Sequence, residues 1–214
     1  MEEHAFLKTR FPDTHGANPE PMKLGLTGGI GCGKSTVTGF FKEAGWHTLE
    51  SDRIVADLLA GDGEVQSALR RRWGDAAFTG DGRVNRRAIA GKVFQDAEEL
   101  RWLEDLLHPR VRRFWQSALA ADPDRNWLVE IPLLLEKRLE TAFDFVVCVS
   151  SSPDVVENRM AARGYTGEDV ERRRLRQMPL DEKVRLADFV ITNAGNLEFL
   201  EQQTLRLIEQ ISGG

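Results

Sequence analysis

Short apolar runs alternate with amphipathic stretches along most of this 214-residue chain. Mainly apolar runs with the length of buried strands lie at 23–27, 127–131, 145–149 and 189–192, and residues 46–50 (WHTLE) resemble a further strand. Segments with helical periodicity lie between or after them, at 34–44, 53–60, 154–186 and beyond 192. Because strands alternate with helices, the pattern predicts an α/β fold with a parallel sheet and right-handed crossovers.

One long stretch, residues 61–122, shows no buried-strand pattern. It contains amphipathic segments at 63–72, 85–94, 96–107 and 109–121, the last of which is expected to begin at Pro109. These features predict a helical domain inserted into a core made of 22–60, 123–153 and 187–214. The strongly charged stretch 154–186 is expected to form a separate helical flap.

The first 21 residues lack helical or strand periodicity and include three prolines. They have no apolar segment of the kind found in secretory signals. We therefore expect residues 1–21 to be a disordered extension, with Met22 as an alternative start.

Composition narrows the possible partners. The chain has 34 acidic and 29 basic residues, for a net charge of −5, and an acidic surface disfavours nucleic acid as a partner. No apolar run approaches the roughly 20 residues that cross a membrane. The two cysteines, Cys32 and Cys148, form no disulfide framework, which favours a cytoplasmic location. We expect a monomer or a weak homo-oligomer.

Residues 28–35 read GGIGCGKS and match the phosphate-binding pattern GxxxxGK[ST] at every fixed position. The motif follows a predicted strand and opens a predicted helix, where glycines let main-chain N–H groups approach an anion. The expected nucleotide-binding residues are Gly29, Ile30, Gly31, Cys32, Gly33, Lys34, Ser35 and Thr36.

Three side chains of this loop have distinct expected roles. Lys34 would reach the β and γ phosphates, Ser35 would bind Mg²⁺, and Thr36 would bond the α phosphate. Cys32 allows two interpretations. It is either a small residue tolerated at a variable position or a redox-sensitive thiol at a helix N-terminus.

Asp52 follows the second predicted strand. The helix after the phosphate loop runs about 15 Å away, and the strand at 46–50 returns by about 16 Å, so residues 50–52 should end near the phosphates. A carboxylate there could accept the proton of an attacking hydroxyl. Alternatively, Asp52 caps a helix that begins at Arg53.

The chain resembles the dephospho-CoA kinase family in five segments, which are MKLGLTGGIGCGKSTV at 22–37, ESD at 50–52, LLHPRVR at 106–112, IPLLLE at 131–136 and the stretch 173–195. The resemblance implies ATP-dependent phosphorylation of the ribose 3′-hydroxyl of dephospho-CoA, with Mg²⁺. It also implies a P-loop kinase core with a five-stranded parallel sheet, a helical substrate domain at 61–122 and a lid at 154–186. Asp52 occupies the position of the family's proposed base.

Further residues are assigned partly by this resemblance. His108 and Arg110 belong to the substrate domain, although a structural role for His108 and a solvated helix face for Arg110 stay open. Pro132 and Leu133 end a strand at the ligand edge and are expected to line the substrate site. Arg163 is the expected catalytic arginine of the lid. Alternatively, it only lies on the solvent-exposed face of a charged helix.

The remaining nucleotide contacts are expected toward the C-terminus. By the resemblance, Arg173 contacts the nucleotide, and Asn193 and Gly195 line the adenine pocket.

The phosphate loop by itself is also compatible with two other functions. The protein could be a kinase for another small acceptor, or a nucleotide-dependent switch. The absence of an NKxD motif in the sequence argues against a GTPase.

Overall fold

A computed structural model describes residues 20–212 of the chain. The expected disordered extension, 1–21, therefore lies almost wholly outside the described residues. The chain forms two compact units, one containing the described residues up to Leu49 together with 122–212, and the other containing 50–121.

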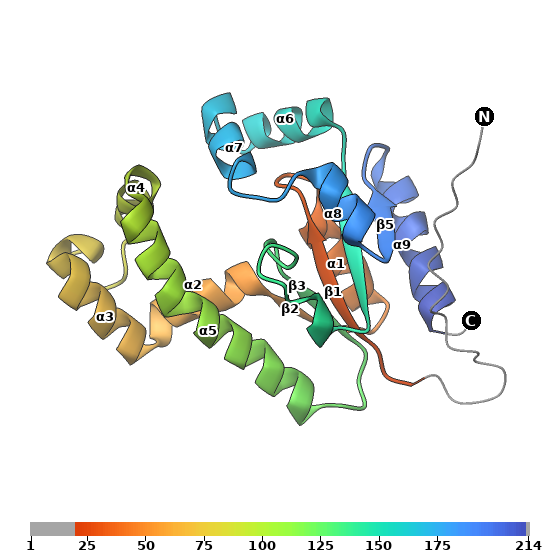
Figure 1. Ribbon diagram of the computed structural model, residues 1–214, viewed down its shortest axis with the longest axis horizontal. Helices are drawn as coiled ribbons and strands as arrows, with labels where there is room; N and C mark the ends of the chain where they lie inside the picture. Colours follow the sequence, from red (N-terminus) through yellow and green to blue (C-terminus); the bar gives the residue numbers. More distant parts are fainter. Residues whose placement is uncertain (1–19, 213–214) are drawn as a thin grey trace. The chain divides into compact units, whose positions relative to one another are not determined.

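The first unit is built on one sheet of five strands (Figure 1), namely β1 (Lys23–Gly28), β2 (His47–Glu50), β3 (Trp127–Glu130), β4 (Phe145–Ser150) and β5 (Phe189–Thr192). Their order is β2-β3-β1-β4-β5, and β1 pairs in parallel with both β3 and β4. The pair β4–β5 is also parallel. The predicted α/β fold with five strands is confirmed.

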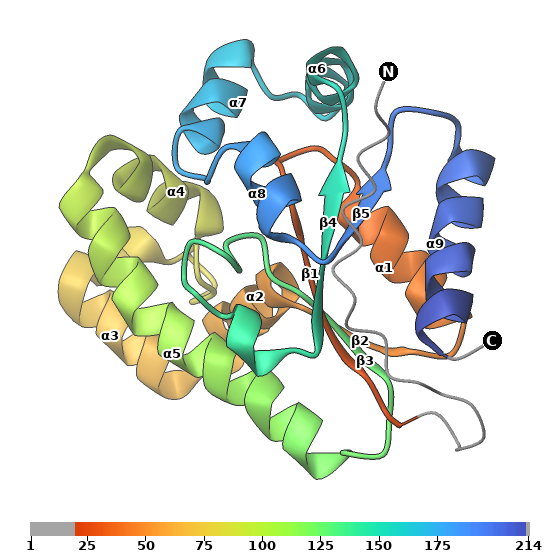
Figure 2. The same cartoon turned by 45° about the vertical axis from the view of Figure 1, so that its right-hand side comes forward.

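Helices cover both faces of this sheet (Figure 2). Helix α1 (Lys34–Glu43) and helix α9 (Leu197–Ile211) pack on each other, α1 also contacting β1 and β3 and α9 contacting β5. Helix α8 (Leu180–Leu186) packs on β1 and β4 from the other side. The connection from β1 through α1 to β2 runs toward one edge of the sheet, and the connection from β4 through α8 to β5 runs toward the other edge. Because right-handed crossovers that run in opposite directions lie on opposite faces, α1 and α8 cover different faces of the sheet.

The stretch between β4 and β5, expected to be a helical flap, folds into three helices, α6 (Pro153–Ala162), α7 (Gly167–Arg174) and α8. Just beyond the end of α6, Gly164 has a φ of 81°, a left-handed conformation that favours glycine. The Gly164 and Tyr165 N–H groups donate to carbonyls of the last turn of α6. Helix α7 begins with a capping box between Thr166 and Asp169.

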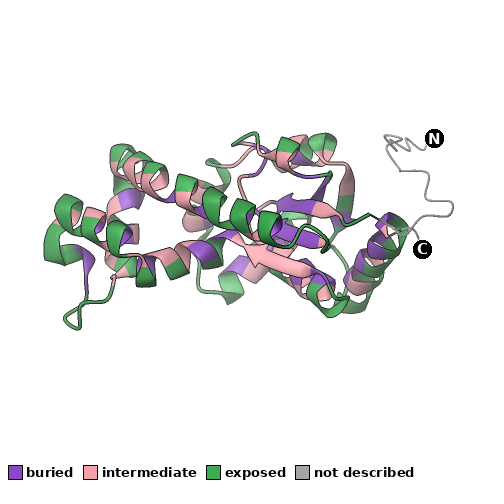
Figure 3. Ribbon diagram, turned by 90° about the horizontal axis from the view of Figure 1, so that it is seen from below, coloured by how far each residue is buried: buried purple, intermediate pink, exposed green. Residues whose placement is uncertain are grey.

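The second unit consists of α2 (Ser51–Gly61), α3 (Gly63–Trp73), the short 3₁₀ turn η1 (Gly74–Ala77), α4 (Arg86–Gln95) and α5 (Ala97–Ala121). It has its own apolar core, which includes Leu59, Val65, Leu69, Ile89, Val93 and Leu107. Buried positions of the chain are purple in Figure 3. None of the helices in residues 20–212 is long and apolar enough to span a membrane.

Helix α5 corrects one prediction. It runs for 25 residues through Pro109, so a separate helix opening at Pro109 is wrong. Proline has no N–H to donate to the carbonyl four residues earlier, which is that of Asp105. Because Pro109 and Asp105 are both exposed, the missing hydrogen bond lies on the solvent side of the helix. The buried stripe Leu107, Val111, Trp115 and Leu119 continues past the proline, so its packing maintains the helix.

Candidate functional site

The phosphate loop joins β1 to α1 through three glycines with positive φ, Gly28 (146°), Gly31 (70°) and Gly33 (94°). Gly28 also lies against β4, where a Cβ would be 2.3 Å from the Val149 carbonyl oxygen. Gly33 is the N-cap of α1, so no side chain caps the helix. An uncapped helix N-terminus approached by flexible backbone is a site for an anion.

Lys34 provides the fixed positive charge of this loop. Its Nζ donates to the carbonyl oxygens of Gly29 at 3.0 Å and Gly28 at 3.3 Å, so the side chain folds back over the loop. Ser35 follows it in the first turn of α1 with an exposed side chain. Both side chains therefore lie at the same helix N-terminus as the glycines.

The thiol of Cys32 is turned into the protein. The side chain is buried, and burial raises its pKa above the ordinary value despite the nearby positive charge of Lys34. A thiol that stays protonated is a poor nucleophile and oxidises slowly. Of the two interpretations of Cys32, the geometry favours the small packed residue.

Two of the residues expected near the adenine follow β5. Asn193 is buried, and its Nδ2 donates to the Cys32 carbonyl oxygen at 2.9 Å. Gly195 lies two residues further along in an exposed position, against Phe199. Asn193 thus contacts the phosphate loop itself, and adenine contacts of either residue stay a prediction.

The arginines of the flap differ in their surroundings. Arg163 is exposed at the C-cap of α6. Arg173, on α7, lies with its guanidinium carbon 4.6 Å from the centre of the Tyr165 ring and donates to the Asp169 carbonyl oxygen at 3.2 Å. Arg163 is therefore free to change position, whereas Arg173 is held by a stacked ring.

Pro132 and Leu133 follow β3 at the carboxyl edge of the sheet, as expected from the sequence. The Pro132 carbonyl oxygen accepts hydrogen bonds from Lys183 Nζ at 2.7 Å and from Thr27 Oγ1 at 3.2 Å. Leu133 is half-buried. The segment is thereby tied to α8 and to β1, which carries the phosphate loop.

In the helical unit, Asp52 is the second residue of α2, and the N-cap is Glu50. The alternative that Asp52 caps a helix beginning at Arg53 is therefore wrong. The Asp52 side chain is exposed and makes no hydrogen bond or ion pair among residues 20–212. Its carboxylate is available to a ligand.

Arg110 lies on α5 beside a cavity of about 530 Å³, lined by Gly63, Glu64, Ser67, Ala68, Arg71, Leu106 and Arg110. The guanidinium of Arg110 donates to Glu64 Oε2 at 3.1 Å and to the Leu106 carbonyl oxygen at 2.8 Å. His108 is half-buried in the middle of α5, one residue before the proline.

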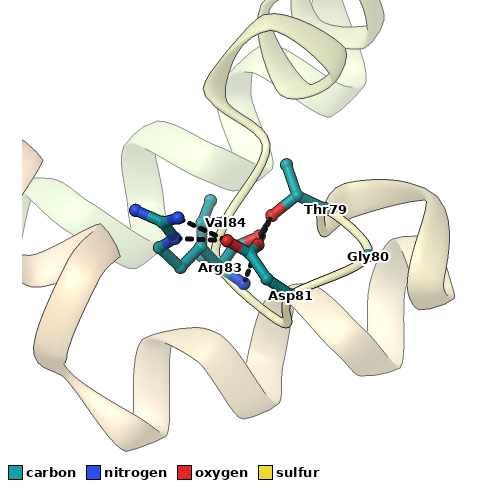
Figure 4. Close-up of a pocket in the computed structure, with 5 residues that line it drawn as sticks. All are labelled: Thr79, Gly80, Asp81, Arg83 and Val84. Carbon is teal, nitrogen blue, oxygen red and sulfur yellow. Dashed lines mark hydrogen bonds and ion pairs between the residues drawn. The ribbon is translucent and has the colours of Figure 1, made fainter.

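A second cavity of the helical unit, about 380 Å³, is formed by the loop 79–84 (Figure 4). The Asp81 carboxylate accepts hydrogen bonds from Thr79 Oγ1 and from Arg83 Nε, the latter at 2.7 Å. These polar groups satisfy one another within the exposed loop. The cavity is therefore a weaker candidate for a ligand than the one beside Arg110.

A family model described as dephospho-CoA kinase matches residues 22–198. The chain belongs to the dephospho-CoA kinase family. It is a kinase that uses ATP, and the family's reaction is the phosphorylation of dephospho-CoA, the last step of coenzyme A biosynthesis.

Relatives match this kinase over most of their length. The dephospho-CoA kinase of Aquifex aeolicus is 33% identical over 191 residues, covering 89% of this chain and 97% of the relative. That of Synechocystis sp. is 36% identical over 191 residues, covering 88% and 95%. The crystal structure of a Thermus thermophilus protein, 35% identical, superposes with a TM-score of 0.75 over 89% of this chain and 98% of that one.

Two polar contacts of this kinase were not predicted from the sequence. Gln177, after α7, accepts a hydrogen bond from the Ile30 N–H of the phosphate loop at 3.1 Å. Thr38 of α1 donates to Glu130 Oε2 of β3 at 3.1 Å, and both side chains are buried. Each contact joins residues that are far apart in the chain, so no local motif indicates it.

Proposed function

We propose that the protein transfers the γ-phosphoryl group of ATP to the ribose 3′-hydroxyl of dephospho-CoA, giving coenzyme A and ADP, with the triphosphate bound at the loop 28–36. The observation that carries this proposal is the uncapped start of α1, reached through three glycines of positive φ. Main-chain N–H groups and the helix dipole favour an anion there.

Lys34 supplies the charge that a triphosphate needs. Its ammonium now rests on two carbonyl oxygens of the loop, at 3.0 and 3.3 Å, which are neutral partners. Phosphate oxygens are charged acceptors and form stronger bonds with an ammonium group. Lys34 would therefore turn toward the β and γ phosphates and neutralise charge during transfer.

Mg²⁺ fits the residues of this loop. Among residues 20–212 no group of three or more acidic, histidine or cysteine side chains could form a cation cage. Mg²⁺ bound with a nucleotide needs few protein ligands, because phosphate oxygens and waters complete its shell. The exposed hydroxyl of Ser35 would provide the one protein oxygen. When bound, the ion neutralises charge on the β and γ phosphates.

Asp52 is proposed as the base. It begins α2 directly after β2, its carboxylate is exposed, and the described residues offer it no hydrogen-bond partner. It would hold the ribose 3′-hydroxyl by accepting its hydrogen bond and take the proton as the oxygen attacks the γ phosphorus. A base that has no partner in the protein loses no hydrogen bond by doing so.

Residues 154–186 are proposed as the lid. Two short helices, α6 and α7, join at Gly164, and Arg163 beside this junction is exposed. A guanidinium brought over the γ phosphate would stabilise the transferring group, and a closed lid would exclude water as a competing acceptor. Arg173, stacked on Tyr165, would contact the nucleotide, and Gly195, in the loop after β5, would border its base.

The helical unit is proposed to bind dephospho-CoA. Its cavity beside α3 and α5 has the volume of a small-molecule site and carries the guanidinium groups of Arg71 and Arg110. These cations suit the diphosphate of the substrate. His108 would contact the same substrate from α5, and Pro132 with Leu133 would line the site from the segment after β3.

The proposal also covers the cellular location and the oligomeric state of the protein. The thiols of Cys32 and Cys148 are both free and buried, which suits the reducing cytoplasm. We expect a monomer or a weak homo-oligomer, whose mass can be measured by light scattering.

Acceptor specificity tests the proposed reaction. Purified protein with MgATP should release ADP when dephospho-CoA is added and should yield a product with one added phosphoryl group by mass spectrometry. Coenzyme A is the matched control, because it differs only in having its 3′-hydroxyl already phosphorylated. ADP release with coenzyme A, with nucleoside monophosphates or with no acceptor at the rate seen with dephospho-CoA would contradict the proposal. Preference for GTP would support a nucleotide switch instead.

A further inference from the structure

The amide of Asn193 is engaged at both ends, although it lies in a loop. Its Nδ2 donates to the Cys32 carbonyl oxygen at 2.9 Å, and its Oδ1 accepts from Arg159 at 2.8 Å. The side chain is only 5% exposed. An ionised carboxylate of the same size could accept from the guanidinium but could not donate to the carbonyl.

The main chain of Asn193 is held equally firmly. Its carbonyl oxygen accepts from Ser151 Oγ at 2.7 Å and from Arg159 at 3.4 Å, and its N–H donates to the Ser150 carbonyl oxygen at 2.7 Å. Ser150 ends β4 and Arg159 lies on α6. The main chain of Asn193 is therefore held by groups outside the phosphate loop, which come from α6 and from the end of β4.

The contact with Cys32 determines how one peptide group of the phosphate loop points. The Cys32 carbonyl and the Gly33 N–H belong to the same planar trans peptide, so they point in opposite directions. Because Asn193 Nδ2 binds the Cys32 carbonyl oxygen, the Gly33 N–H of the same peptide points away from the Asn193 amide. An amide oriented in this way before binding need not be reoriented by the anion.

The close approach also explains why position 33 is glycine. A Cβ there would lie 2.2 Å from Asn193 Nδ2, so the amide or the loop would have to shift. The same imaginary Cβ would lie 3.9 Å from an Arg159 guanidinium nitrogen, so this cation is close to the loop. In the described part of the chain Arg159 forms no ion pair, and its charge adds to the positive field of the anion site.

We infer that Asn193 is a positioning residue of the phosphate loop, with Arg159 holding its amide, and that the pair sets the affinity for the phosphates of the nucleotide. The inference rests on the proposed function, because it requires a triphosphate on the loop. It differs from the expectation that Asn193 borders the adenine, and the two make opposite predictions for ligands that lack one half of ATP.

Binding of tripolyphosphate and of adenosine to Asn193→Ala, measured by calorimetry or by competition, tests the inference. Tripolyphosphate and ATP should both bind more weakly by the same factor, about 5- to 30-fold, as expected for one lost hydrogen bond in a buried site. Adenosine should bind as it does to the wild type, and the KM for dephospho-CoA should not change. Weaker adenosine binding with unchanged tripolyphosphate binding would overturn the inference.

Two further variants separate positioning from folding. Asn193→Asp keeps the size and an acceptor for Arg159 but cannot donate to Cys32, so it should lose at least as much tripolyphosphate affinity. Asn196→Ala is the matched control, because Asn196 lies in the same loop and caps α9 through the Phe199 N–H at 2.8 Å. It should lower the thermal midpoint and leave tripolyphosphate affinity unchanged. Equal losses of tripolyphosphate affinity in Asn193→Asp and Asn196→Ala would overturn the inference.

A double variant tests the role of Arg159. Because Arg159 acts partly through Asn193, Arg159→Ala combined with Asn193→Ala should lose less tripolyphosphate affinity than the product of the single losses. Fully multiplicative losses would show that Arg159 does not act through the amide. If the wild-type protein bound neither ATP nor tripolyphosphate, the proposed function would fail first, before any variant is compared.

Discussion

Lys183 and Glu136 form a buried ion pair at the end of the flap, with Nζ 2.8 Å from Oε1. The Lys183 side chain is fully buried, and the same Oε1 accepts from the Met178 N–H at 2.9 Å. The pair joins α8 to the segment after β3 and fixes the point at which the flap returns to the sheet. One residue before Met178, Gln177 accepts a hydrogen bond from the Ile30 N–H, so this anchor lies close to the phosphate loop.

Removing one member of this pair should destabilise the protein strongly. Lys183→Met leaves the Glu136 carboxylate buried without a counter-charge, which typically costs about 3–5 kcal/mol of unfolding free energy. Urea unfolding measures the loss. Glu136→Gln combined with Lys183→Met should recover much of it, because no isolated charge remains. Lys42→Met, on the exposed side of α1, is the control and should change stability by about 0.5 kcal/mol or less. Equal stability of Lys183→Met and wild type would refute the role of the pair.

Lys34→Ala should weaken nucleotide binding and turnover together. The ammonium is the fixed cation of the phosphate loop, and the loss of one such preorganised group typically lowers kcat by about 10²–10³-fold. Calorimetry with ATP and steady-state turnover give the two values. The unfolding midpoint should fall much less than turnover does, because the two loop hydrogen bonds that are lost end on neutral carbonyls. Retention of wild-type ATP affinity would contradict the proposed placement of the triphosphate.

Much of the sheet could be predicted from the sequence because four of its five strands, β1, β3, β4 and β5, are short and mainly apolar. Phe189–Thr192, for example, is a strand within the expected bounds. The phosphate loop was also predictable, since its glycines and Lys34 are contiguous. Pro109 was misinterpreted because local propensity places proline at a helix start, whereas the buried stripe through Leu107 and Val111 keeps α5 continuous.

Contacts that support the site could not be predicted in the same way. Asn193 and Cys32 are 161 residues apart, and their contact depends on how β4 and β5 are arranged beside β1. The pairing of Lys183 with Glu136 likewise depends on α8 packing against the sheet. Such long-range polar contacts leave no periodicity in the sequence, and only the folded chain reveals them.

Asp52→Asn tests the proposed base. The amide keeps the size of the side chain but cannot accept the proton, so kcat should fall by about 10²–10⁴-fold. ATP affinity should change little, because Asp52 is not part of the phosphate loop. Asp57→Asn, on an exposed position of the same helix, should leave kcat unchanged. Near-normal turnover of Asp52→Asn would remove Asp52 from the mechanism.

Alanine at two glycines of the same region should have opposite effects. Gly33→Ala forces a side chain into a φ of 94° and against Asn193, so ATP affinity and stability should both fall. Gly39→Ala is a matched substitution within α1, where nothing lies within 4 Å of the added carbon. It should raise the free energy of unfolding by about 0.5–1 kcal/mol with unchanged ATP affinity. A stabilised Gly33→Ala with normal ATP affinity would contradict the described loop.

Stability should decline in alkaline solution because of the buried thiol of Cys148. Burial raises its pKa to about 12, from an ordinary value of 9.0 in the unfolded chain. Below about pH 9 the thiol is protonated in both states and has no effect on the pH dependence. Between about pH 9 and pH 12 only the unfolded state loses the proton, so the folded state loses about 1.4 kcal/mol of stability for each pH unit.

The variant Cys148→Ala isolates this contribution, since all other groups that titrate in alkali are shared with the wild type. The variant should be less stable at about pH 8, where a small cavity is the main change, but its stability should fall less steeply above about pH 9. Part of the slope should remain, because burial also raises the pKa of Cys32. Urea unfolding at several pH values gives both slopes, and identical slopes would mean that the Cys148 thiol ionises as readily in the folded protein as in the unfolded chain.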